Sequence, residues 1–244
     1  MSKPLIVIDP GHRGGDPGAV GYVKEADVAY QIGKYTQKAL EDNYICETYI
    51  TSGTDSTKQR AAKANKRGAV LFLSIHLDAF KPEVGDGWTG LVYSAKNKEL
   101  GKIFEKHVKA AGQNSRGVKY RPDLNVLKFT NMAAILNECA FVDTKKDIED
   151  WNEPHEWKKM GEALAEAAAE FSNLQEKGEK TETGVYKITV SALNVRSGPG
   201  MDYKKVTKVK KGDAYTIVEI SGNWGKLKSG AGWINISEKY CKRM

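Results

Sequence analysis

The segment VLFLSIHLDAF (residues 70–80) begins as an apolar run and ends in polar residues. An apolar run of this length is typical of a strand that is covered on both faces of a sheet. Similar short runs recur along the first two thirds of the chain. We therefore expect strands at residues 5–9, 45–50, 69–75, 91–94 and 133–137.

Amphipathic segments lie between and after these runs. Apolar residues recur at the three- and four-residue spacing of a helix within residues 28–39, 100–108 and 157–171. Strands and helices in alternation predict an α/β fold, with a twisted, mostly parallel sheet and helices on both faces.

The net charge of +7 is concentrated at the C-terminal end. Residues 185–244 contain 12 Lys and Arg against 4 Asp and Glu, a charge of +8, which leaves −1 for the rest. Before them, QEKGEKTETG (residues 175–184) has the composition of a linker that cannot bury itself. We expect a large domain at 1–174, a linker at 175–184, and a small all-β barrel at 185–244, because short strands there alternate with Gly-rich turns.

Composition excludes several classes of protein. With 40% hydrophobic and 28% charged residues, the 244-residue chain is an ordinary globular protein. Its longest apolar runs fall far below the roughly 18–20 residues of a membrane span, so no membrane insertion is expected. The three cysteines form no CxxC pair and are expected to be free thiols. The first residues contain no hydrophobic region of a signal peptide, which leads us to expect synthesis in the cytoplasm.

Four segments place polar residues near the ends of apolar strands or at the start of a helix. They contain His12, Glu25, His76 and Glu138. Strand ends meet at one edge of an open α/β sheet, so these side chains can converge. Two His and one Glu form a zinc site with an open fourth position, and a remaining Glu would be a base. From spacing alone, an ordinary structural role for each His is an equally good interpretation, and we assign that role to His107 and His155.

Other polar residues in these segments have two interpretations. Asp9, Asp16 and Asp78 could orient the imidazoles or could cap turns. Cys139 could be a nucleophile, although its neighbours fit the end of a strand.

Five blocks in order carry a resemblance to a known family: IDPGHRGGDPGA (residues 8–19), Glu25, Arg60 with Asn65, SIHLDA (74–79) and LNECAFVDTKKD (136–147). The pattern is similar to that of the zinc-dependent N-acetylmuramoyl-L-alanine amidases of the amidase_3 family, over about residues 4–172. The resemblance implies that His12, Glu25 and His76 bind Zn²⁺ and that Glu138 is the catalytic carboxylate. Arg13, where the family has Gly, and CAF followed by Val142-Asp143 depart from the pattern.

The implied reaction is hydrolysis of the amide between N-acetylmuramic acid and L-alanine in peptidoglycan. An amide is a poor electrophile and water a poor nucleophile, so a Zn²⁺ ion would polarise the carbonyl and lower the pKa of water from 15.7 toward about 7. Glu138 would take the proton from that water and pass it to the departing amine.

The basic C-terminal segment resembles bacterial SH3 (SH3b) domains. Its signature is LNVRSGPG (residues 193–200), Tyr203, Gly212, Trp224 and Gly232-Trp233. The resemblance implies binding to peptidoglycan or attached cell-wall polymers, and the charge of +8 suits a polyanionic wall. Binding of single-stranded nucleic acid by such a barrel is the disfavoured alternative, because the run KKVTKVKKG (204–212) is expected in a turn-rich segment.

A catalytic domain followed by a wall-binding domain resembles the endolysins of phages that infect Gram-positive hosts. This order predicts an enzyme that is made in the host cytoplasm, reaches the cell wall through a separate membrane pore and lyses the cell. Two alternatives stay open: a zinc endopeptidase of the stem peptide, and a non-catalytic wall-binding protein.

Overall fold

The computed structural model describes residues 3–149, 154–177, 183–201, 203–221 and 223–244. The chain divides into two compact units, Met1–Glu176 and Lys177–Met244. Gln175 and Glu176, which the sequence assigned to the linker, pair with the first unit, since Ile45 N donates to Gln175 O at 2.7 Å. At the other end, Gly184 is already the first residue of a strand. Residues 178–182 of the expected linker lie outside the described residues.

The first unit is built on a six-stranded sheet. Its strands, in spatial order, are β2 (Glu47–Ile50), β1 (Leu5–Pro10), β3 (Leu71–Asp78), β6 (Ala133–Phe141), β4 (Trp88–Val92) and β5 (Ser115–Tyr120). Every neighbouring pair is parallel except β4 and β6, which are antiparallel. The mostly parallel sheet expected from the sequence is therefore confirmed.

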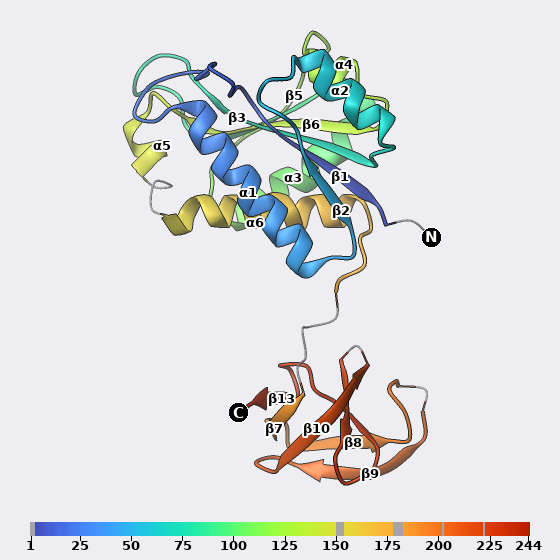
Figure 1. Ribbon diagram of the computed structural model, residues 1–244. Coiled ribbons are helices and arrows are strands. Elements are labelled where there is room, and N and C mark those ends of the chain that lie inside the picture. Colours follow the sequence, from blue (N-terminus) through green and yellow to red (C-terminus); the bar gives the residue numbers. More distant parts are fainter. Residues whose placement is uncertain (1–2, 150–153, 178–182, 202, 222) are drawn as a thin grey trace. The chain divides into compact units, whose positions relative to one another are not determined.

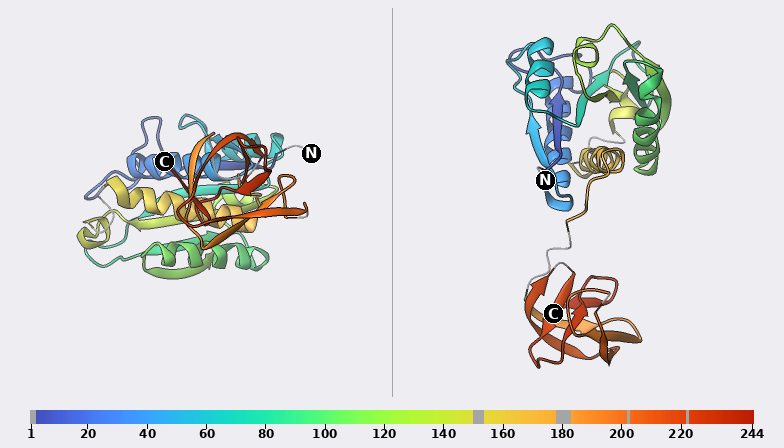
Figure 2. Two further views of the ribbon diagram at one scale, coloured as in Figure 1. Left: turned by 90° about the horizontal axis from the view of Figure 1, so that it is seen from below. Right: turned by 90° about the vertical axis from the view of Figure 1, so that its right-hand side faces the viewer.

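Helices cover both faces of this sheet, as Figures 1 and 2 show. One face carries α1 (Glu25–Asn43), α3 (Lys98–Ala110) and α6 (Pro154–Phe171), and the other carries α2 (Thr57–Lys66) and α4 (Asn125–Lys128). The short η1 (Ala95–Asn97) and α5 (Lys145–Glu149) lie in connections. Successive strand residues alternate between two apolar clusters, so that Leu73 belongs to one and Phe72 to the other. Burial on both faces explains why these strands read as continuous apolar runs.

The sequence did not predict α2 and β5. The buried residues of α2 are Arg60, Ala61 and Ala64, so the helix has no stripe of large apolar residues to reveal its period. Its start is instead fixed by a capping box between Ser56 and Gln59. β5 is a largely exposed edge strand without apolar alternation.

The short helices α2 and α4 leave part of their sheet face uncovered. On β3, His76 follows Phe72 at an even spacing and projects from the same face. On β6, Glu138 follows Leu136 in the same way. This end of the face therefore carries His76 and Glu138, two of the four polar residues that the sequence singled out.

The second unit is an antiparallel sheet of seven strands. In spatial order they are β13 (Cys241–Arg243), β7 (Gly184–Ile188), β10 (Ala214–Ser221), β11 (Trp224–Leu227), β12 (Trp233–Asn235), β8 (Ala192–Arg196) and β9 (Lys205–Lys210). Side chains such as Ile188, Val195 and Ile234 form its core. The all-β prediction is confirmed, but the basic run expected in a turn-rich segment forms the edge strand β9. Among the described helices of the whole chain, none has both the length and the apolar character needed to cross a membrane.

Candidate active site

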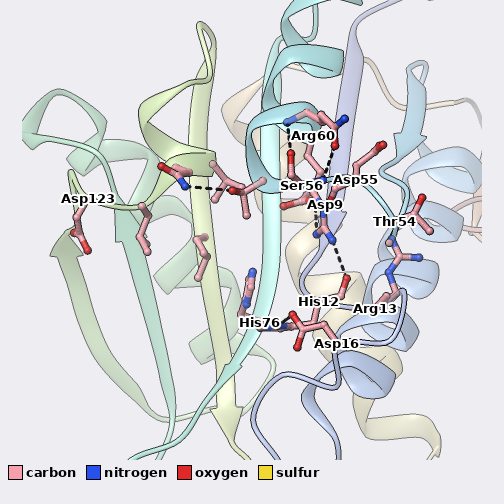
Figure 3. A pocket seen from close by; sticks show the side chains of 17 residues that line it. Asp9, His12, Arg13, Asp16, Thr54, Asp55, Ser56, Arg60, His76 and Asp123 are labelled. Carbon is pink, nitrogen blue, oxygen red and sulfur yellow. Dashed lines mark hydrogen bonds and ion pairs between the residues drawn. The ribbon is translucent and has the colours of Figure 1, made fainter.

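Three of the predicted residues converge. His12 lies in the turn after β1, Glu25 is the first residue of α1, and His76 lies near the end of β3. One ligand atom from each lies within 4.8 Å of the others. The two imidazole rings meet edge to face, with their centroids 5.1 Å apart, and Figure 3 shows them side by side with Asp16.

The buried carboxylate of Glu25 joins the two histidines. Its Oε1 lies 2.8 Å from His76 Nδ1 and 3.1 Å from His12 Nε2. The backbone N–H groups of Leu77 and Ala19 donate to its two oxygens at 3.2 and 2.9 Å. Burial on its own raises the pKa of Glu25, but the hydrogen bonds with His12 and His76 outweigh it and lower the pKa. The site therefore favours the charged carboxylate of Glu25 as the acceptor between two imidazoles.

The pKa values of the two imidazoles shift in the opposite direction, upward. The hydrogen bond to Glu25, opposed by burial and aided by Asp16, raises the pKa of His12 to about 9. Burial lowers the pKa of His76, yet its hydrogen bond to Glu25 and the charge of Glu138 raise it overall. Positive charge is thus favoured at this cluster, which is the environment that a bound cation also needs.

Asp16 holds the second ring nitrogen of His12. Its Oδ2 lies 2.8 Å from His12 Nδ1, and its Oδ1 accepts from Gly18 N at 3.0 Å. Both sequence interpretations of Asp16 therefore apply, since it orients an imidazole and closes a turn. Asp78 caps its own strand end, accepting from Ala79 N at 2.9 Å.

Two glycines allow the side chains of His76 and Glu25 to approach the backbone. A Cβ on Gly11 would lie 2.2 Å from His76 Cε1, and a Cβ on Gly18 would lie 2.5 Å from Glu25 Oε2. Gly18 also has a φ of +66°, which disfavours other residues. Gly11 and Gly18 are therefore required by this close packing.

Asp9 and Arg60 brace the turn that carries His12. The buried Asp9 carboxylate accepts from Thr51 Oγ1 at 2.6 Å and Ser74 Oγ at 2.8 Å, and pairs with Arg60 Nη1 at 3.2 Å. Arg60 also donates to the carbonyls of Pro10 and His12, at 3.1 and 2.8 Å. Asp9 therefore supports His12 through Arg60. The sequence located Arg60 only through the resemblance, because nothing local links residues 51 positions apart.

Arg13, the departure from the family pattern, has a positive φ of 77°. This conformation costs a non-glycine residue about 1–2 kcal/mol. The Arg13 guanidinium offsets the cost by donating to Thr51 O at 2.5 Å and by stacking 4.7 Å from the centre of the Tyr30 ring. Arg13 thus ties the turn to α1 and to the end of β2.

Glu138 lies beside the cluster on β6, as the register partner of His76 on β3. Burial raises the pKa of its carboxyl to about 7, against the opposing charge of His76. Its Oε2 is buried without a hydrogen-bond partner among the described residues. A carboxyl group that titrates near neutrality can both accept and return a proton.

The remaining candidates lie elsewhere or have other roles. Cys139 is fully buried, and burial raises the pKa of its thiol well above its usual value, which disfavours a thiolate nucleophile. His107 pairs with Glu166 and Glu170 between α3 and α6, on the other face of the sheet. The side chain of His155 is outside the described residues.

A groove of about 620 Å³ opens beside the cluster. Figure 3 shows His12 and His76 at one end, with Ser56 and Arg60 of the α2 region along it and Asp123 on the opposite side. The lining of the groove also includes Asn125 and Val126 of α4 and Leu136 of β6. His12 and His76 therefore face a space that can admit an extended substrate.

Comparison with known proteins gives matches for both units. Residues 6–170 match the family model of N-acetylmuramoyl-L-alanine amidases, and residues 191–240 match that of bacterial SH3 domains. The chain is 31% identical to an endolysin of Bacillus phage SPP1, over 98% of both proteins. It is 28% identical to a sporulation-specific N-acetylmuramoyl-L-alanine amidase of Bacillus subtilis, over 79% of this chain and 76% of that protein.

Solved structures agree with this result. An N-acetylmuramoyl-L-alanine amidase from Clostridium difficile 630 has a TM-score of 0.66 at 26% identity, covering 71% of this chain and 98% of that one. The catalytic domain of an amidase from Bacillus (Paenibacillus) polymyxa has the same TM-score at 23% identity, covering 70% and 99%, and so supports the fold. The chain belongs to the N-acetylmuramoyl-L-alanine amidase family, enzymes that act on peptidoglycan, and carries a bacterial SH3 domain after the catalytic unit.

Proposed function

We propose that the first unit hydrolyses the amide between the lactyl group of N-acetylmuramic acid and L-alanine in a zinc-dependent reaction. His12, Glu25 and His76 would hold the ion, and Glu138 would move the proton. The observation that carries this proposal is the meeting of three potential ligand atoms within 4.8 Å, beside Glu138, whose buried Oε2 has no hydrogen-bond partner in the described part of the chain.

The three side chains fit Zn²⁺. Two imidazole nitrogens and one carboxylate oxygen are a donor set of catalytic zinc sites, which leave one position open. Donor atoms around tetrahedral zinc lie about 3.4 Å apart, given bonds of about 2.0–2.2 Å, so the described cluster needs only small adjustments. When bound, Zn²⁺ polarises the scissile carbonyl and lowers the pKa of water into the neutral range.

Glu138 would act as the proton carrier. Burial and the charges of Asp78 and Glu25 favour the neutral acid, while the charges of His76 and His12 favour the carboxylate, and the balance leaves the pKa of Glu138 at about 7. The carboxylate can accept a proton from the attacking water and return it to the departing amine. General acid–base catalysis of this kind contributes about 10²–10⁴-fold to rate.

The second unit would retain the enzyme on the cell wall. Five lysines are exposed on or beside β9, and none of them forms an ion pair within the described residues. They are Lys204, Lys205, Lys208, Lys210 and Lys211. A row of cations on an edge strand suits the phosphate-bearing polymers of a Gram-positive wall. Lysines on an edge strand also protect it from aggregation, so wall binding by the β9 lysines needs its own test.

The biological role that we propose is lysis of a bacterial host. The similarity over the full length to a phage endolysin supports synthesis in the host cytoplasm and action at the wall after release through a separate membrane pore.

Digestion of purified cell walls tests the reaction. The parent enzyme should release new N-terminal alanine and free muramoyl lactate, and Glu138→Gln should lose turnover while keeping about one zinc per chain. Glu25→Ala should lose the zinc. Other new amino termini would indicate an endopeptidase instead, and no cleavage by the zinc-loaded parent would indicate a non-catalytic wall-binding protein.

A further inference from the structure

Two buried side-chain oxygens that have no hydrogen-bond partner among the described residues lie on neighbouring strands of the catalytic unit. One is Oγ1 of Thr89 on β4, and the other is Oε2 of Glu138 on β6. Thr89 is only 2% exposed. Each such atom costs about 1–3 kcal/mol when it is left without a hydrogen bond, so two adjacent cases call for a common explanation.

The strand register places these residues directly opposite each other. β4 and β6 are antiparallel, and Thr89 pairs with Glu138 just as Leu91 pairs with Leu136. Opposite residues project from the same face with Cβ atoms about 4.5–5.5 Å apart. Leu91 and Leu136 both belong to the apolar cluster under α2 and α4, so Thr89 and Glu138 lie on that same sheet face, with Glu138 opposite His76 of β3.

The chemistry of the two groups is complementary. A hydroxyl can donate, and an ionised carboxylate can only accept. A small rotation that brings Thr89 Oγ1 to Glu138 Oε2 would satisfy both atoms with one charge-assisted hydrogen bond. Ser74, a hydroxyl on the same face of β3, is already committed to Asp9.

Two irregularities in the sheet flank this pair. The β4–β5 register shifts between Trp88 and Gly90, and the β3–β6 register shifts between His76 and Asp78. Such shifts occur next to active sites because they redirect individual side chains. Here they fall at Thr89 on one side of Glu138 and beside its partner His76 on the other.

We propose that Thr89 is a positioning residue that donates a hydrogen bond to Glu138 Oε2 during turnover. The bond holds Oε2 on the β4 side of the carboxylate. The other oxygen, Oε1, is then free to face the reacting water next to the His12, Glu25 and His76 cluster. This inference rests on the proposed role of Glu138.

Two substitutions at Thr89 separate the hydroxyl from the shape of the side chain. Thr89→Val keeps the shape and removes the hydroxyl, whereas Thr89→Ser keeps the hydroxyl. Thr144→Val is the matched control, because Thr144 Oγ1 is also buried with no partner that the structure describes, but Thr144 lies away from the strands, directly before α5. The full-length, zinc-loaded variants are assayed for kcat and KM on a soluble muramoyl-peptide, for zinc content and for thermal unfolding.

We expect Thr89→Val to lower kcat by about 10- to 100-fold, the range for loss of a hydrogen bond to a charged group, with KM and zinc content unchanged. Thr89→Ser should retain kcat within about threefold, and Thr144→Val should match the parent. Thr89→Val should also unfold at the parent's temperature or above, because it removes a buried unpaired hydroxyl.

The inference would be overturned if Thr89→Val kept the kcat of the parent. It would also be overturned if Thr89→Val and Thr89→Ser lost kcat to the same extent. Loss of zinc along with kcat in Thr89→Val would also overturn it, because the residue would then support the metal site. Failure of the proposed function gives a different result, namely a parent without amidase activity or a Glu138→Gln variant with full turnover.

Discussion

Asp16 and Glu25 hold opposite nitrogens of one imidazole ring: His12 Nδ1 lies 2.8 Å from Asp16 Oδ2, and its Nε2 lies 3.1 Å from Glu25 Oε1. The ring therefore cannot rotate about its axis without losing a charged partner. Carboxylates that fix the second nitrogen of a ligand histidine typically set both its tautomer and its affinity for metal.

Asp16→Ala should weaken zinc binding by about 10- to 100-fold, the usual effect of removing such a partner. Competition with a chromogenic chelator measures the affinity. Asp27→Ala, an exposed acid in the first turn of α1, controls for the loss of one negative charge. Equal affinities of the two variants would show that Asp16 only closes its turn.

Arg60→Leu should lower the free energy of unfolding by about 3–5 kcal/mol, because it leaves the charge of Asp9 buried without its ion-pair partner. Lys63→Leu, on the same helix, removes an ion pair with Asp55 in which the lysine is 46% exposed, and should cost less than about 1 kcal/mol. Urea denaturation measures both. Similar losses of unfolding free energy in the two variants would mean that the buried Asp9–Arg60 pair has no special role in holding the turn that carries His12.

The stability of the second unit should depend on Cys241 at high pH. Burial raises the pKa of its thiol from 9.0 to about 11, and the thiol also donates to Asn235 O at 3.4 Å. The unfolded chain therefore ionises first, and the free energy of unfolding should fall as the pH rises from about 9 to about 11. Cys241→Ala should lack this component, so the stability difference between parent and variant should narrow over that range in denaturation experiments. A constant difference would rule out the linkage.

The β9 lysines should carry much of the attraction to the wall. Replacing Lys205, Lys208 and Lys210 by Glu should weaken sedimentation with teichoic-acid-bearing walls by about tenfold or more at low salt. The control replaces Lys187, Lys228 and Lys242, exposed lysines outside β9, and changes the net charge equally. Equal losses of wall binding in the two triple variants would mean that only the net charge matters. If the parent protein bound walls stripped of phosphate polymers as well as it binds intact walls, the binding partner would be peptidoglycan itself.

Regular apolar patterns predicted the parts of the fold that bury large side chains. β1, β3 and β6 were visible as continuous apolar runs because both of their faces are covered. α2 was missed because it buries small residues and an arginine, and β5 was missed because it is largely exposed. Elements such as α2 and β5, which bury few large side chains, leave no apolar period in the sequence.

The candidate site divides in the same way. The sequence determines which residue types stand after the strands, and the resemblance implies the roles of His12, Glu25, His76 and Glu138. Tertiary structure decided the rest: the Asp9–Arg60 brace, the hold of Asp16 on His12, and Thr89 opposite Glu138. Those relationships depend on sheet register and on contacts between distant segments, and strand-to-strand register is fixed only when the whole core packs.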